Sequence, residues 1–406
     1  MQLRIVPVLQ EYRRLASTKF DSLVAISLIS SQLNALPLSL MCSIPLTWIS
    51  VMRKARCEVI DSSEINVVHV YNRTVRRCFL FGQDPLTDKN FDHRKVWIEE
   101  WLEHFAAHFG IDLLTFAVLN NHFHLILRNR PDVVRTWSDT EVARRWLMIC
   151  PHRTDKQGKP MAPSEAELNL IRNCPLKLAQ TRERLADVSW WMRLLCQRIA
   201  MRSNREDQAT GRFFEERYKA IRLIDEASII ACSAYVDLNP IRAEICQTIE
   251  SSEHTSARRR IDSMRQQHQA ERPEPKSFQR DPAAFLSPLS IDEKSDPTGP
   301  CASDQGKRCS EKGFLAMSLL DYIELLDWTA RQSHRSKRGK TPTDLPPVIK
   351  RLGIAPDDWC ELVSSFGRLF HHVAGNPDTI DSMRSHRKHQ RFRVHRRVRE
   401  LMSTED

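Results

Sequence analysis

Two apolar segments separated by only two asparagines constrain the fold of this chain more than any other feature. Residues 113–119 and 122–127 are both rich in apolar side chains, and Asn120 and Asn121 lie between them. Asparagine tolerates the positive φ that a two-residue hairpin turn demands at its central positions. We therefore expect an antiparallel β-hairpin here.

Two further strands and a helix are indicated around this hairpin. Residues 67–72 are mostly β-branched and aromatic, which predicts a first strand, and residues 218–224 predict a last one. Apolar residues at helical spacing predict a helix over residues 92–109 that ends at Gly110. The hairpin thus follows a strand and a helix in chain order.

A second group of helices completes the pattern. Helical spacing recurs at residues 139–148 and 188–201. Another helix begins near Asp225, a suitable N-cap, and must end by Asn239 because Pro240 follows. The resulting order, β-α-β-β-α-β, predicts an α+β fold with a ferredoxin-like antiparallel sheet and helices on one face.

The start of the chain requires a separate interpretation. Residues 22–52 carry no charge, but serine, asparagine and proline interrupt their apolar runs. A membrane-spanning helix needs about 20 predominantly apolar residues, so we predict no membrane role. We interpret residues 1–51 as a disordered extension or the product of a start codon assigned too early, since Met52 offers a natural start.

The remaining domain boundaries follow from composition. We assign residues 52–257 to the main domain. Residues 258–312 are poor in large apolar side chains and rich in Ser, Pro, Arg and Glu, which predicts a linker. Residues 313–406 then form a C-terminal helical extension, with helices near residues 314–328 and 347–370, and end in a basic tail.

The charge balance favours a polyanionic partner. Lys and Arg number 61 against 51 acidic residues, which gives a net charge of +10. Such an excess suits nucleic acid or an anionic surface, although it is a weak signal alone. The 11 cysteines show no C-x-x-C pair or zinc spacing, so we expect reduced thiols in a cytoplasmic protein.

The second hairpin strand opens with a pair of histidines. His122 and His124 flank Phe123, and residues two apart in a strand point to the same face. Two convergent imidazoles suit a divalent metal that keeps open positions for a phosphate oxygen. A bare His-x-His motif is also common by chance, so the pair alone does not establish a metal site.

A tyrosine and an asparagine share one face of a predicted helix. Tyr235 and Asn239 are four residues apart, about one helical turn. A phenol with a pKa near 10 becomes a useful nucleophile only when its anion is stabilised or its target phosphate is polarised. A metal held by His122 and His124 would polarise the phosphate. The alternative is that Tyr235 is a core residue and Asn239 simply ends the helix.

Several separated motifs resemble one family in the same chain order. The segments are residues 69–81 (HVYNRTVRRCFLF), 118–127 (VLNNHFHLIL), 211–224, which opens GRFFE, and 234–243 (AYVDLNPIRA). Together they resemble the insertion-sequence-200-like transposases, and most closely their REP-associated tyrosine transposase relatives, which are single-tyrosine HUH nucleases. The resemblance covers residues 52–257, and the motifs are specific only in combination.

This resemblance implies a chemistry and a set of partners. It implies a DNA transposase and endonuclease in which Tyr235 forms a covalent 5′-phosphotyrosine link to single-stranded or hairpin DNA. The link leaves a free 3′-hydroxyl that can reverse the attack, so cleavage and rejoining need no nucleotide cofactor. It also implies Mg²⁺ or Mn²⁺ on His122, His124 and Asn239. The protein would be a monomer or homodimer in the bacterial cytoplasm, associated with the nucleoid when bound to DNA.

Basic residues near these motifs are candidate phosphate contacts. They are Arg73, Arg76, Arg77, Arg128, Arg198, Arg202 and Arg205. The tail at residues 384–399 carries eight Lys or Arg residues and would add salt-dependent affinity for DNA. Solvated charge is the plain alternative for each of these positions.

Two other functions remain open from the sequence. The first is a transposase-derived protein that binds nucleic acid without cleaving it. The second is a metal-dependent phosphodiesterase in which water replaces Tyr235 as the nucleophile. A covalent protein–DNA adduct would separate the transposase from both alternatives.

Overall fold

The computed structural model describes residues 59–270, 280–292, 294, 306–333, 346–386, 392 and 394–402. The predicted extension at residues 1–51 lies outside this described part. The described residues belong to one compact unit. This unit is a mixed α+β structure around a five-stranded sheet, which agrees with the predicted fold class.

Strands from distant parts of the chain form the sheet in the order β2-β3-β1-β4-β5. The strands are β1 (Val67–Arg73), β2 (Ile111–Val118), β3 (His122–Asn129), β4 (Lys219–Leu223) and β5 (Val373–Ala374). The pairs β2–β3, β1–β3 and β1–β4 are antiparallel, whereas β4–β5 is parallel. The predicted hairpin is confirmed as β2–β3. The short parallel edge strand β5, from the C-terminal region, was not expected.

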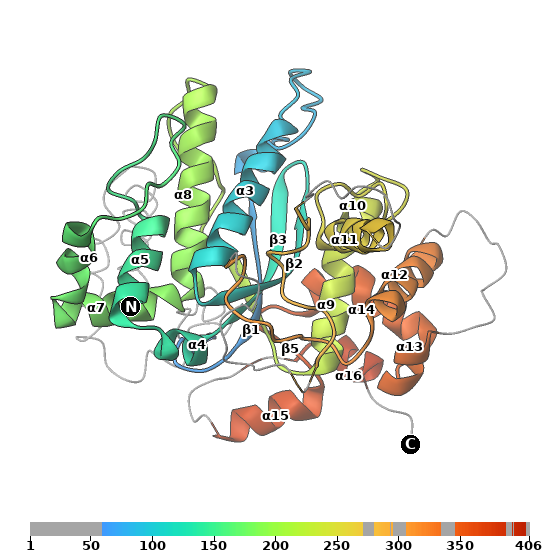
Figure 1. The fold of residues 1–406 in the computed structure, drawn as a ribbon. Coiled ribbons are helices and arrows are strands. Elements are labelled where there is room, and N and C mark those ends of the chain that lie inside the picture. The colour runs from blue at the N-terminus through green and yellow to red at the C-terminus, as the bar shows by residue number, and fades with distance from the viewer. Residues whose placement is uncertain are drawn as a thin grey trace, which may run out of the picture. The chain divides into compact units, whose positions relative to one another are not determined.

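Helices cover both faces of this sheet (Figure 1). Helices α3 (His93–His108) and α8 (Val188–Glu206) lie on one face, and α9 (Glu226–Asp237) and α14 (Pro356–Leu369) lie on the other. The prediction that helices cover one face only is therefore wrong. The physical reason is visible in β2, which is buried along its whole length, because a strand covered on both faces needs a continuous apolar run rather than alternation.

Alternating side chains of the central strands supply two separate cores. Val68 and Val70 of β1 join Phe123 of β3 and the α3–α8 side chains in the first core. Ile126 of β3 and Ile221 of β4 join the apolar residues of α9 and α14 in the second. By the two-residue period of a strand, His69, Tyr71, His122 and His124 must lie on the α9 face. The sheet thus aligns all four rings.

Most of the predicted helices lie close to their predicted positions, but the one near residues 314–328 begins at Leu319, and residues 347–370 form two helices instead of one. The helix predicted over residues 92–109 is α3, and the one from Asp225 is α9, in which the Asp225 side chain accepts from the N–H of Ser228. The other described helices are η4 (Val75–Arg77), α4 (Pro131–Thr136), α5 (Asp139–Ile149), α6 (Glu165–Arg172), α7 (Pro175–Leu185), α10 (Asn239–Arg242), α11 (Ser256–Ala270), α12 (Leu319–Ser333), α13 (Pro347–Leu352), α15 (Pro377–His386) and α16 (Arg396–Leu401). None of the described helices is both long and apolar enough to cross a membrane.

Parts of the segment predicted as a linker pack onto the main domain. Helix α11 covers residues that this prediction left without structure. Phe285, Leu286 and Cys309 are buried in the core of the α3 face, and the N–H of Ser287 donates to the carbonyl of Leu113 in β2 at 2.9 Å. The described residues of 258–312 therefore contribute to the fold, because a few well-placed apolar side chains suffice to fix a polar segment.

Asp237 at the end of α9 joins this helix to two later ones. The carboxylate accepts from the Ser256 hydroxyl at 2.7 Å, the Ala257 N–H at 3.0 Å and the Tyr322 hydroxyl at 2.8 Å. It is 1% exposed. Asp237 thus satisfies the Ala257 N–H in the first turn of α11 and the hydroxyls of Ser256 and Tyr322, which makes it a buried acceptor shared by two later helices.

Candidate active site

Two adjacent strands bring four aromatic and histidine rings together. Strand pairing sets Tyr71 opposite His124 and Arg73 opposite His122. The ring centroids of His122 and His124 are 5.0 Å apart in an edge-to-face arrangement. His69, two residues before Tyr71, stacks on His124 with centroids 5.1 Å apart. The pair predicted from the sequence thus belongs to a larger cluster.

Helix α9 places Tyr235 against this cluster. The ring centroid of Tyr235 is 5.4 Å from that of His124 and 5.9 Å from that of His69, both edge to face. The two predicted histidine ligands and the predicted nucleophile thus lie together within one chain. This cluster is largely enclosed, since His124 is only 3% exposed and Tyr235 is half-buried.

Asn239 and Arg242 contact Tyr235 from the next turn of the chain. The Asn239 side chain lies close enough to the Tyr235 hydroxyl to favour the ionised phenol. The Arg242 guanidinium carbon lies 5.1 Å from the ring centroid of Tyr235. Burial raises the pKa of Tyr235 above its usual 10.0, and the Arg242 charge and the Asn239 side chain oppose that rise. The surroundings therefore hold a neutral phenol beside groups that would stabilise its anion.

Helix α14 covers the other side of Tyr235. Phe366 stacks on the tyrosine ring with centroids 5.7 Å apart. A Cβ on Gly367 would lie 3.2 Å from the Tyr235 hydroxyl oxygen, so the helix backbone approaches closely. Arg242 also donates a hydrogen bond to the Ser364 carbonyl of α14. The C-terminal region, which lies beyond the sequence resemblance, thus encloses the candidate nucleophile.

Both predicted histidine ligands are suited to bind a cation. Burial lowers the pKa of His122 to about 4 and that of His124 well below its usual value, so each imidazole is neutral at pH 7. Metal binding requires neutral imidazoles. The Nε2 atom of His124 is buried and has no hydrogen-bond partner among the described residues, so it is the atom of this ring that could face a ligand.

The ligands of a metal bound here, other than the two histidine nitrogens, would have to be oxygen atoms. Within the described residues, no group of three or more His, Cys, Asp or Glu side chains could hold a metal ion. A two-histidine site would therefore use an amide, water or phosphate oxygen, as Mg²⁺ and Mn²⁺ accept. Asn239, the third predicted ligand, lies beside the Tyr235 hydroxyl and opposes the rise in its pKa, so its amide would have to serve both the metal and the tyrosine.

Three predicted phosphate contacts lie at the edge of this site. Arg73 is half-buried beside His122 and helps to lower the pKa of that histidine. Arg76 and Arg77 are exposed in the turn that follows β1, where both adopt positive φ, 53° and 58°. Non-glycine residues rarely adopt this conformation, so the backbone of the turn is strained. The turn exposes the two adjacent arginine side chains.

Arg128 is not available to DNA phosphates. Its guanidinium is 6% exposed and forms an ion pair with Asp112 at 2.7 Å. It also donates to the Gly313 carbonyl at 2.8 Å. The sequence prediction for Arg128 is therefore wrong, because its side chain holds the segment near Gly313 against β2 and β3 instead of facing solvent.

The three predicted arginines of α8 lie on the helix layer opposite Tyr235. Arg198 stacks over Trp101, with its guanidinium carbon 4.3 Å from the ring centroid, and Arg202 does the same over Trp97 at 3.8 Å. Arg205 is exposed. These residues do not join the histidine–tyrosine cluster, so any DNA contact that they make belongs to a different surface.

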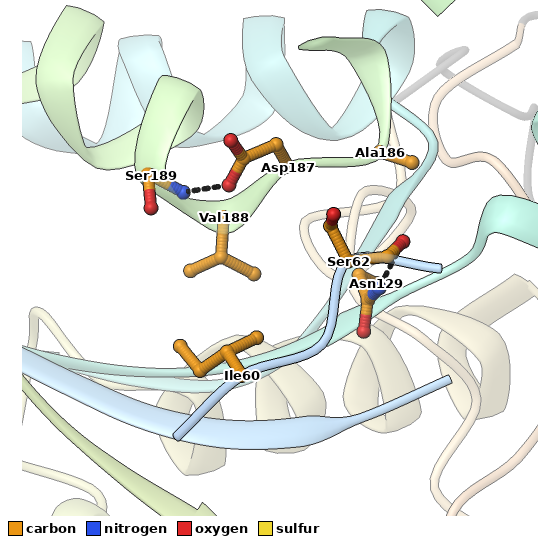
Figure 2. A pocket seen from close by; sticks show the side chains of 7 residues that line it. All are labelled: Ile60, Ser62, Asn129, Ala186, Asp187, Val188 and Ser189. Atoms are coloured by element: carbon orange, nitrogen blue, oxygen red, sulfur yellow. Dashed lines mark hydrogen bonds between the residues drawn. The ribbon is translucent and has the colours of Figure 1, made fainter. Parts of the chain in front are cut away.

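A small cavity elsewhere in the fold carries no comparable chemistry. Figure 2 shows this cavity, which has a volume of about 100 Å³ and lies near the N-terminus of α8. Its single carboxylate, Asp187, accepts from the N–H of Ser189 at 2.7 Å and caps that helix. Because this acidic group serves the helix end, the candidate site remains the cluster around Tyr235.

Sequence reasoning missed several members of the cluster. His69 and Tyr71 lie in a predicted strand, but only the register with β3 shows that they meet His124. Arg242 lies in the same motif as Tyr235, seven residues later, so its proximity was readable from helical spacing. Phe366 and Gly367 gave no signal, since their position depends on how the C-terminal helices pack.

Comparisons with known proteins give one distant similarity. No family model matches the chain, and no curated protein matches it. Among solved structures, a REP-associated tyrosine transposase bound to a REP hairpin matches with 8% identity and a TM-score of 0.28. The match covers 53% of this chain and 88% of that one. A similarity of this size carries no argument about function, which must rest on the site itself.

Proposed function

We propose that this protein is a metal-dependent tyrosine transposase that cleaves and rejoins single-stranded or hairpin DNA. The observation that carries the proposal is the approach of Tyr235 to His124, with ring centroids 5.4 Å apart, beside the second histidine of a His-x-His strand. The proposal includes a ferredoxin-like sheet, supported by the antiparallel order β2-β3-β1-β4.

In the proposed reaction Tyr235 is the nucleophile. Its hydroxyl oxygen attacks the scissile phosphorus and forms the P–O bond of a 5′-phosphotyrosine. The P–O3′ bond breaks, the phenol gives up its proton, and the leaving 3′ oxygen takes one up. Attack by a 3′-hydroxyl on the phosphotyrosine reverses these changes, so the phosphodiester bond energy is conserved through the cycle and no nucleotide is consumed.

Side chains around Tyr235 have defined tasks in this scheme. Arg242 and the Asn239 amide stabilise the developing phenolate, since both already oppose the rise in its pKa. His122 and His124 would hold Mg²⁺ or Mn²⁺, which would polarise the phosphate and withdraw charge from it. Arg73, Arg76 and Arg77 would hold the flanking DNA backbone.

An adduct assay tests the nucleophile. Single-stranded hairpin DNA labelled on its 3′ side is incubated with the protein and Mg²⁺ or Mn²⁺, and a labelled covalent band is expected on a denaturing gel. Tyr235→Phe should abolish the band. Tyr71→Phe is the matched control, because Tyr71 also lies against His124, with ring centroids 5.3 Å apart. Loss of the adduct in Tyr71→Phe but not in Tyr235→Phe would contradict the assignment.

One observation favours a second candidate, a transposase-derived protein that binds DNA without cleaving it. Helix α14 lies on Tyr235, and the Phe366 ring and Gly367 backbone occupy space beside its hydroxyl. Binding to the hairpin without cleavage or adduct would support this second function. Cleavage without an adduct would instead indicate a water nucleophile.

A further inference from the structure

His69 contacts the candidate metal ligand His124 directly. The Nε2 atom of His69 lies 2.9 Å from the Nδ1 atom of His124, within hydrogen-bond distance. Both side chains are buried, with exposures of 0% and 3%. His69 stands diagonal to His124 across the β1–β3 pair, since its direct partner is Ile126. The contact therefore follows from strand register and not from proximity in sequence.

A hydrogen bond between two ring nitrogens needs one proton, and its position decides what His124 can do. If His69 donates from Nε2, the Nδ1 of His124 accepts and its Nε2 carries a proton, so Nε2 cannot bind a metal. If His124 donates from Nδ1, its Nε2 keeps a free lone pair. That Nε2 atom is buried and has no hydrogen-bond partner within the described residues. Only the second arrangement leaves it usable.

We propose that His69 is a positioning residue that accepts the Nδ1 proton of His124 and so directs the Nε2 lone pair of His124 toward the metal. This inference rests on the proposed function, because it assumes a cation at His122 and His124. A histidine ligand commonly donates its other ring N–H to an acceptor that fixes its tautomer and orientation. His69 provides this acceptor from a neighbouring strand.

The surroundings of His69 argue against a role in packing alone. Its ring packs against both Tyr71, with centroids 5.4 Å apart, and His124, with centroids 5.1 Å apart. Its own Nδ1 is buried with no partner among the described residues. An apolar ring would fill this place without burying an unsatisfied polar atom, which costs free energy. The contact of the His69 Nε2 atom with the Nδ1 atom of His124 explains why a polar ring occupies this place.

The test measures Mn²⁺ binding to the full chain by electron paramagnetic resonance, without DNA. His69→Phe keeps a ring but removes the acceptor, and we expect Mn²⁺ affinity to fall by about 10- to 100-fold. His69→Gln offers a carbonyl oxygen near the position of Nε2, and we expect it to restore most of the affinity. Equal losses in both variants, or wild-type affinity in His69→Phe, would overturn the inference.

Two control variants separate this inference from the proposed function. His124→Ala should abolish Mn²⁺ binding, whereas His108→Gln, on the other face of the sheet, should leave it unchanged. If the wild-type protein binds no Mn²⁺, the proposed metal site fails. If the wild-type protein binds and His124→Ala does not, while His69→Phe binds normally, only the role of His69 fails.

A measurement on the unmodified protein guards against variants that do not fold. Two-bond ¹H–¹⁵N correlation spectra of the histidine rings report which nitrogen carries the proton. In the Mg²⁺-loaded protein we expect the Nδ1–H tautomer of His124 and an unprotonated Nε2 in His69. The opposite tautomers would overturn the proposal whatever the variants show.

Discussion

Two pairs of neighbouring histidines lie on opposite sides of the sheet. Helix α3 supplies the first pair, and strands β1 and β3 supply one residue each to the second. His104 and His108 of α3 have ring centroids 4.6 Å apart, and those of His69 and His124 are 5.1 Å apart. Helical spacing alone creates the α3 pair, and His104 uses its Nε2 to contact the Met148 carbonyl at 2.9 Å. The second pair needs two strands in register and lies against Tyr235 of a third element. The comparison shows that local helical spacing is enough to bring two imidazoles together, whereas placing them beside a nucleophile requires the tertiary fold.

The largest difference between the two histidine pairs is expected in the formation of the covalent DNA adduct. His124→Ala should reduce the yield of the covalent DNA adduct by about 1,000-fold, since polarisation of the phosphate by a metal contributes several kcal/mol. His108→Ala should leave the yield within about twofold of wild type. Gel quantification with a 3′-side label measures both. Similar losses in the two variants would mean that the α9 face has no special role.

A second prediction concerns what holds α9 in position. Asp237→Ala should lower the free energy of unfolding by roughly 3 kcal/mol, because it removes a buried acceptor that satisfies Ser256, Ala257 and Tyr322. Chemical denaturation followed by circular dichroism measures the loss. Asp262→Ala is the matched control: that carboxylate is 26% exposed and pairs with Arg258, so we expect under about 1 kcal/mol. Equal losses would show that Asp237 is not a structural centre of this face.

Individual helices and the hairpin could be predicted from the sequence, because they depend on residues close together in the chain. Apolar periodicity predicted α3, the Asn-Asn turn predicted β2–β3, and Pro240 predicted the end of α9, which the structure places at Asp237. The His122–His124 pair followed from the two-residue period of a strand. These inferences depend only on neighbours along the chain.

The features that were missed depend on long-range packing. The burial of Arg128 follows from its pairing with Asp112 on the neighbouring strand, and the contact between His69 and His124 follows from strand register. The cover of Phe366 on Tyr235 joins residues far apart in sequence. One missed feature was readable: the nearly continuous apolar run of β2 indicated a strand buried on both faces.

Acid titration should reveal both histidine pairs through stability. Burial lowers the pKa of His69 and of His108 from 6.5 to about 3. The unfolded chain therefore binds these protons more readily, so the stabilisation is complete above pH 6.5 and is lost as the pH falls toward 3. Between pH 6.5 and pH 5, each group should contribute up to about 2 kcal/mol to the loss.

Urea denaturation at pH 7.5 and pH 5 measures this difference. His69→Gln and His108→Gln should each make the free energy of unfolding less dependent on pH, because glutamine does not titrate. If His108→Gln leaves the pH dependence unchanged while His69→Gln reduces it, only the pair on the α9 face is truly buried in solution. That outcome would show that the two histidine pairs differ in burial.

The smallest effect concerns Gly367, where the covering helix meets the nucleophile. Alanine is favoured over glycine inside a helix by about 1 kcal/mol, so Gly367→Ala should raise stability by up to about that amount. Its Cβ would lie 3.2 Å from the Tyr235 hydroxyl oxygen, which must shift by a few tenths of an ångström. We therefore expect adduct formation to slow by about threefold, the effect of well under 1 kcal/mol on a rate, while Ser365→Ala on the same helix leaves it unchanged. Higher stability with an unaltered adduct rate would mean that α14 leaves Tyr235 before the phosphate arrives, so that the α9 face closes over its tyrosine only in the absence of DNA.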